Sequence, residues 1–128
     1  MAEPFIFTNT YALKEGKLGA FEEAIPEWLE FLETNHPRLL HFGVYSNGER
    51  EVTAVQVHPD VASMEQQMQL ISGRHEGWYQ FIDWSKMRVE VHGTPSNALL
   101  EQMGQVAGPG VPLTVKRPLG GFSRLPEL

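Results

Sequence analysis

The spacing of hydrophobic residues changes along the chain, and each change predicts a new secondary-structure element. Residues 5–13 are rich in aromatic, β-branched and threonine side chains and end at a polar turn, which predicts a first strand. Apolar residues then recur at helical spacing from Leu18 to Leu32, with glutamates over the remaining surface, and predict an amphipathic helix that ends at 35–37. Pro26 lies inside this helix, where we expect it to produce a kink or to begin a new first turn.

Two further strands flank a turn signal. Residues 39–46 and 51–58 read as strands, and Asn47-Gly48 between them suits the positive backbone angles of a tight antiparallel hairpin. A two-residue loop and a four-residue loop would distribute the side chains over the two faces in the same way. One face would be apolar and carry Phe42, Val44, Val55 and Val57. The other face would carry four polar or aromatic side chains, His41, Tyr45, Gln56 and His58.

The chain after the hairpin predicts a second helix and a fourth strand. Asp60 or Ser63 can cap a helix that has an apolar stripe in 64–71. Helical spacing resumes in 78–86, and 87–93 then alternates in polarity as a strand.

The resulting order, β-α-β-β-α-β, is that of the ferredoxin-like unit. The predicted fold class is therefore α+β with an antiparallel sheet, and residues 4–93 would form its core. The remaining 94–128 would add a short helix and a fifth strand at 113–116 as a C-terminal extension. Because this extension is too short to hold a core of its own, we expect a single domain over 1–128.

The predicted sheet has a face that its helices do not cover. Two helices can cover only one face of a four-stranded sheet, and an open face with Tyr45 and other large side chains favours a partner. We therefore expect a homodimer in which the two sheets face each other. The alternative is a monomer with a solvated face of mixed polarity.

Composition narrows the classes of function. The net charge of −6 argues against nucleic-acid and anionic-membrane partners, because those surfaces bind clustered lysine and arginine. The chain has no cysteine, which excludes disulfides, thiolate metal sites and cysteine nucleophiles. Neither a secretory signal pattern nor a run of eighteen apolar residues occurs, and we expect a cytoplasmic location.

The stretches "FIFTNTYALKEGKLGAFEEAI" and "VTAVQVHPDVASMEQQM", in this order of elements, resemble the dimeric α+β barrel superfamily. Within it, residues 4–93 are most similar to antibiotic biosynthesis monooxygenase-like domains, and closest to uncharacterised members. The resemblance implies a pocket between sheet and helices, with an asparagine on the first strand, a tryptophan after the third and a histidine on the second helix. Asn9 and His75 match the first and last of these, whereas His58 stands near the tryptophan position, so haem degradation is not expected.

The resemblance implies a monooxygenase that acts without a cofactor on a small aromatic or polycyclic phenol. His75 would be the base that removes the phenolic proton, with His58 as the alternate, and Asn9 would hold a peroxy intermediate. Asn9 on the pocket wall requires Phe7 to point toward the helices and Ile6 toward the partner sheet. The alternative function is a non-catalytic dimer that binds a small ligand.

Each candidate also has a structural alternative: a turn contact for Asn9, a backbone hydrogen bond for His75, and a hydrogen bond to the following helix for His58. The stretch "GRHEGWYQFIDW" supplies the expected substrate-binding side chains, Trp78, Tyr79 and Trp84. Trp78 would pack mainly in the core, and the other two would wall a pocket for a flat aromatic ligand. The polar sheet face lacks a third strong metal ligand, so no metal site is expected.

Overall fold

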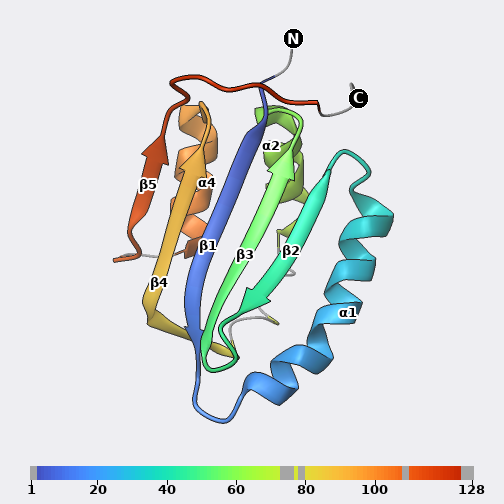
Figure 1. Cartoon of the computed structure of the whole chain (residues 1–128), viewed down its shortest axis with the longest axis vertical. Helices are drawn as coiled ribbons and strands as arrows, with labels where there is room; N and C mark the ends of the chain where they lie inside the picture. The colour runs from blue at the N-terminus through green and yellow to red at the C-terminus, as the bar shows by residue number, and fades with distance from the viewer. Residues whose placement is uncertain (1–2, 73–76, 78–79, 108–109, 125–128) are drawn as a thin grey trace.

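A computed structural model describes residues 3–72, 77, 80–107 and 110–124 (Figure 1). In chain order its elements are β1 (Phe5–Leu13), α1 (Leu18–Asn35), β2 (His41–Ser46), β3 (Glu51–His58), α2 (Val61–Ile71), β4 (Ile82–His92), α4 (Asn97–Ala107) and β5 (Leu113–Lys116). This order contains the predicted β-α-β-β-α-β unit followed by the predicted extension. The α+β fold class is therefore confirmed.

The five strands form one sheet in the order β2-β3-β1-β4-β5. The first four strands pair antiparallel, as predicted, whereas β5 runs parallel to β4. The parallel pairing arises because α4 carries the chain back along the sheet between β4 and β5, as a crossover helix does. The sheet is consequently mixed and open, with β2 and β5 at its two edges.

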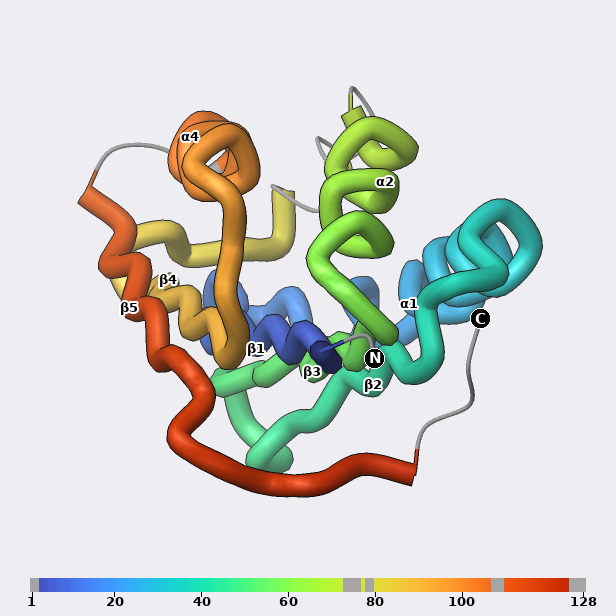
Figure 2. Tube along the Cα trace, turned by 90° about the horizontal axis from the view of Figure 1, so that it is seen from above, coloured from blue at the N-terminus to red at the C-terminus, as the bar shows by residue number. Residues whose placement is uncertain are grey.

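The helices α2 and α4 lie side by side on one face of the sheet (Figure 2). On β1, Phe5 and Tyr11 point toward this helical layer and are buried in the core, while Phe7 and Asn9 line a pocket below it. Ile6 alternates to the opposite, open face, because successive strand residues point to opposite sides. The predicted orientation of β1 is confirmed.

The hairpin between β2 and β3 differs from the prediction. Phe42 pairs with Gln56 and Val44 pairs with Ala54, so the apolar side chains of β2 share a face with Gln56. The last paired residues of the hairpin, Ser46 and Val52, are separated by five residues, 47–51, rather than two or four. A connection of odd length inverts which side chains share a face, and the predicted grouping was therefore wrong.

His41 and Tyr45 consequently lie on the open face, on the opposite side of the sheet from Gln56 and His58. The Tyr45 ring folds back over Gly43, where an added Cβ would lie 2.7 Å from a ring carbon, and its hydroxyl lies 3.1 Å from His41 Nε2. Only glycine leaves space for this close approach.

The strand β4 begins earlier than predicted. The sequence predicted a helix in 78–86, whereas Ile82–His92 is a single strand. The register of its pairing with β1 shifts part-way along, as at a β-bulge. Trp84 and Met87 are three residues apart, yet both line the pocket, which strict alternation would not allow.

The helices agree with their predictions more closely than the hairpin and β4 do. Pro26 lies inside the single helix α1, so the helix does not begin again there. The carboxylate of Asp60 accepts a hydrogen bond from the Ser63 backbone N–H at 2.9 Å and caps α2, which confirms one of the two predicted caps. Asp60 also forms an ion pair with Arg38. No helix in the described residues is both long enough and apolar enough to cross a membrane.

The open face carries no helix in the described part of the chain, and Tyr45 on it is 52% exposed. After β5, residues 117–124 run on this side of the sheet without forming a helix or a strand (Figure 2). Leu119 and Phe122 in this segment are 103% and 82% exposed. The homodimer stays a prediction.

Candidate functional site

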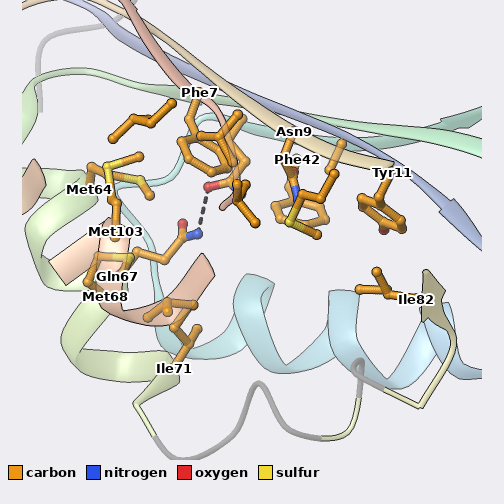
Figure 3. A pocket seen from close by; sticks show the side chains of 18 of the residues that line it. Phe7, Asn9, Tyr11, Phe42, Met64, Gln67, Met68, Ile71, Ile82 and Met103 are labelled. Atoms are coloured by element: carbon orange, nitrogen blue, oxygen red, sulfur yellow. Dashed lines mark hydrogen bonds between the residues drawn. The ribbon is translucent and has the colours of Figure 1, made fainter. Parts of the chain in front are cut away.

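A cavity of about 160 Å³ lies between the sheet and the helical layer (Figure 3). Its walls are predominantly apolar and include aromatic and thioether side chains, among them Phe7, Trp28, Phe42, Met64, Met68 and Trp84. Methionine side chains adapt their shape to irregular apolar surfaces, and aromatic rings provide flat walls. The cavity is therefore suited to a small, largely apolar molecule.

The C-terminal extension builds one wall of this cavity. Met103 and Val106 of α4 and Leu113 of β5 all line it, and Met103 is only 5% exposed. The irregularity in β4 adds a second contribution, because it directs both Trp84 and Met87 inward. The extension is thus part of the candidate site rather than an addition outside it.

Besides the indole N–H groups of Trp28 and Trp84, four lining side chains carry polar atoms: Asn9, Tyr11, Gln56 and Gln67. Gln67 Nε2 donates a hydrogen bond of 2.6 Å to Gln56 Oε1, drawn in Figure 3. Asn9 Oδ1 and Gln67 Oε1 are both buried and have no hydrogen-bond partner in the described structure. Because buried polar atoms are nearly always hydrogen-bonded, these two acceptors can take hydrogen bonds from donors of a molecule that enters the cavity.

The described lining of the cavity contains no histidine, lysine, arginine or carboxylate. Tyr11 is its one side chain with a titratable group, and burial raises the pKa of the Tyr11 hydroxyl well above its ordinary value. Tyr11 therefore stays protonated at neutral pH and can act only as a neutral hydrogen-bonding group. Proton removal in this pocket would require a group from outside the described lining.

His58 lies behind Gln56 rather than on the cavity wall. Its side chain is fully buried, with Nδ1 2.7 Å from Ser63 Oγ and Nε2 3.3 Å from Gln56 Oε1. Burial, with a smaller contribution from the neighbouring His36, lowers the pKa of His58 to about 3. The hydrogen bond to the following helix is thus present, and the geometry favours a positioning role for His58 over contact with a substrate.

His36, at the end of α1, continues this cluster. Its Nε2 donates to the Ser63 carbonyl oxygen at 3.0 Å, and its ring centre lies 5.8 Å from that of His58. Burial lowers the pKa of His36 as well. These side chains form a buried chain of hydrogen bonds, which we call the buried chain. It runs from His36 through Ser63 and His58 to Gln56 and then to the cavity at Gln67.

The other predicted site residues divide into two groups. Asn9 and Trp84 both line the cavity, as the substrate-pocket hypothesis requires. His75, Trp78 and Tyr79 lie outside the described residues. The predicted proximity of His41 to His58 does not occur, because the two lie on opposite faces of the sheet, and no three metal-ligating side chains gather in the described residues.

Sequence reasoning missed Gln67, although a signal for it was present. Gln67 falls on the same helical stripe as Met64, Met68 and Ile71, at the spacing of residues that face the core. A glutamine at such a position is buried and needs a partner there, and Gln67 is only 2% exposed.

This arrangement, a ferredoxin-like sheet with a layer of helices on one face, also occurs in other proteins of known structure. Two proteins, each named as a putative antibiotic biosynthesis monooxygenase, share it. The one from Bacteriodes thetaiotaomicron has a TM-score of 0.57 and 14% identity over 68% of this chain and 85% of its own. The one from Caulobacter crescentus has a TM-score of 0.61 and 11% identity over 70% of this chain and 88% of its own.

MupZ from Pseudomonas fluorescens resembles this protein over nearly its whole length. Its TM-score is 0.73 at 18% identity, over 97% of this chain and 91% of MupZ. The likeness therefore includes the C-terminal extension that lines the cavity. At these identities it shows the fold alone. No protein-family model matches the sequence, and no curated protein matches it by sequence.

Proposed function

We propose that this protein is a cofactor-independent monooxygenase that binds a small aromatic or polycyclic phenol between its sheet and its helices. The observation that carries the proposal is the apolar cavity with two unpaired acceptors, Asn9 Oδ1 and Gln67 Oε1. A phenol has the matching chemistry, because it combines a flat apolar body with a hydroxyl donor. The fold shared with proteins named as monooxygenases supports the choice of reaction.

The proposed reaction needs only a base and dioxygen. The base removes the phenolic or enolic proton, and the electron pair of the resulting carbanion forms a carbon–oxygen bond to dioxygen. Loss of water from the hydroperoxide, with the second hydrogen of that carbon, leaves a quinone carbonyl. One oxygen atom ends in the product and the other in water, and the carbon supplies the electrons.

Within this proposal, His75 is the base and Asn9 holds the peroxide. His75 follows Ile71, the last residue of α2 and part of the cavity wall, by four positions in the sequence. His58 is a weaker candidate for the base, since both ring nitrogens are hydrogen-bonded inside the protein. Trp84, with Trp78 and Tyr79, would contact the aromatic rings of the substrate.

Dioxygen consumption tests the proposal. The wild type should consume dioxygen with at least one member of a panel of naphthols and anthrones, without added metal or flavin. His75→Ala should lose this activity but still bind the substrate, and Glu30→Gln, at an exposed position of α1, should keep it. Consumption that is equal in the wild type and His75→Ala would refute His75 as the base.

A second candidate function is non-catalytic binding of the same class of ligand. The lack of an ionisable base in the described lining favours it. Saturable binding of a naphthol or anthrone with no dioxygen consumption would establish this function and exclude the oxygenase for that ligand.

We also propose that the protein forms a homodimer through the open face of its sheet. Tyr45 is half exposed there, and the 117–124 segment presents Leu119 and Phe122 on the same side. Large apolar side chains held in water favour association with a partner surface.

A further inference from the structure

We propose that Gln67 determines which ligands the cavity accepts, by presenting a hydrogen-bond acceptor whose direction is set by the buried chain behind it. The inference rests on the proposed binding of a phenol and deepens it. The pocket should select molecules that offer a hydroxyl or N–H donor to Gln67 Oε1. It should discriminate against molecules of the same shape that offer only an acceptor.

The donor and the acceptor of each hydrogen bond in the buried chain follow from the groups that can play only one of the two roles. The Ser63 carbonyl oxygen can only accept, so His36 Nε2 must carry a proton and donate to it. With Gln56 Oε1 as the shared acceptor, His58 Nε2 donates to it at 3.3 Å and Gln67 Nε2 donates at 2.6 Å. The other nitrogen of neutral His58, Nδ1, then accepts from the Ser63 hydroxyl at 2.7 Å.

Reversal of this chain would leave a buried donor without an acceptor. If Gln56 turned its amide nitrogen toward His58 and Gln67, His58 Nδ1 would have to donate to the Ser63 hydroxyl. Apart from His58, the hydrogen-bond partner of Ser63 Oγ in the described structure is His36 Nε2 at 3.5 Å, which already donates to the Ser63 carbonyl. A buried hydroxyl donor that is left unpaired destabilises a protein, so the observed direction is favoured.

The consequence reaches the cavity through Gln67. Because its amide nitrogen is committed to Gln56, its Oε1 is the atom left unpaired. Asn9 on β1 contributes a second unpaired acceptor, and Figure 3 shows Asn9 and Gln67 reaching into the pocket from the sheet and from the helical layer. Ser63 and His58 are therefore positioning residues, which act on the ligand only through Gln56 and Gln67.

A pair of matched ligands tests the inference on the full-length protein. The dissociation constants of 1-naphthol and 1-methoxynaphthalene are measured by isothermal titration calorimetry at pH 7 under nitrogen, so that no oxidation occurs. Their ratio, ether over naphthol, is compared between variants, which removes the difference in hydrophobicity between the two ligands. In Gln67→Met the ratio should fall about fivefold, the size of one net hydrogen bond.

Two further variants separate the effect of the Gln67 acceptor from the effect of the side chains that position it. Gln66→Met makes the same substitution at an exposed position of α2 that does not line the cavity, and it should leave the ratio at the wild-type value. Ser63→Ala removes the hydroxyl that holds His58 in one tautomer, so the ratio should also fall, although Ser63 does not line the cavity. Ser63→Ala also keeps the test decisive if Gln67→Met does not fold.

Each outcome bears on the inference separately from the oxygenase. A ratio that is unchanged in Gln67→Met, or one that rises, would overturn it, because Gln67 would then be uninvolved or would be a donor. Failure of the wild type to bind either ligand would overturn both this inference and the proposed phenol pocket. A ratio that falls as expected, with no dioxygen consumption, would support this inference and refute only the oxygenase.

Discussion

Replacement of His58 by glutamine should make the stability of the protein less sensitive to acid. His58 is fully buried, and its pKa is lowered from 6.5 to about 3, mainly by burial. Between these two values the unfolded chain binds a proton at this position and the folded chain does not. The contribution of neutral His58 is therefore fully present above pH 6.5 and is lost as the pH falls toward 3.

The size of the effect follows from the shift. Each pH unit within the window reduces the free energy of unfolding by about 1.4 kcal/mol. Between pH 7 and pH 5, His58 should therefore account for a loss of about 2 kcal/mol in the wild type. Asp60 and Arg38 are the charged groups beside it, and the lowered pKa of Asp60 places its titration below this range.

Urea denaturation at pH 5, 6, 7 and 8, followed by far-ultraviolet circular dichroism, provides the measurement. His58→Gln should be less stable than the wild type at pH 7 but should lose about 2 kcal/mol less on going to pH 5. His36 is buried beside His58 and also has a lowered pKa, so part of the pH dependence should remain. The reasoning is refuted if His58→Gln and the wild type lose equal stability between pH 7 and pH 5.

Three further predictions concern other parts of the molecule. Tyr45→Asp should dissociate the proposed dimer, because it would bury an unpaired charge at a cost of several kcal/mol; sedimentation of the wild type itself as a 14.5 kDa monomer at micromolar concentration would contradict the dimer. Gly104→Ala should stabilise α4 by about 0.5–1 kcal/mol in thermal denaturation, since an added Cβ meets nothing within 4 Å, and a lower midpoint would disprove this. Asp60→Ala should lower stability by about 1 kcal/mol or more, because it removes both the α2 cap and the ion pair with Arg38. Asp60→Asn should retain most of the cap. Equal losses of stability in the two variants would assign the whole effect to the ion pair.

The element order could be predicted because each long segment buries one continuous stripe. Phe5–Leu13 forms the predicted strand with the same bounds, and the helix expected from Leu18 ends at Asn35. In both segments the periodicity of apolar residues and the polar residues at the ends give the same answer. These elements could be predicted from the sequence because the local pattern of apolar residues agrees with their burial in the tertiary structure.

The faces of the hairpin could not be predicted, because they depend on whether its connection has an odd or even number of residues. Asn47-Gly48 does form part of the turn, and Gly48 has a φ of +86°. The turn nevertheless extends to five residues, and this inverted the grouping of side chains. The predicted parity placed Gln56 and His58 with Tyr45 on the face that the helices do not cover. Both are instead buried under α2, where Ser63 and Gln67 satisfy their hydrogen bonds.

The difference between local and tertiary determinants also explains which residues of the candidate site could be predicted from the sequence. Asn9 and Trp84 could be found through their local pattern and the family resemblance. The pairing of Gln67 with Gln56 is non-local, because it depends on how α2 lies across β3, and it decides that Gln67 presents oxygen rather than nitrogen to the cavity. A buried glutamine on an apolar helical stripe can be recognised from sequence as needing a partner. Whether its free atom accepts or donates is set by the complete buried chain, which ends 31 residues earlier at His36, so ligand preference in this fold is a property of tertiary structure.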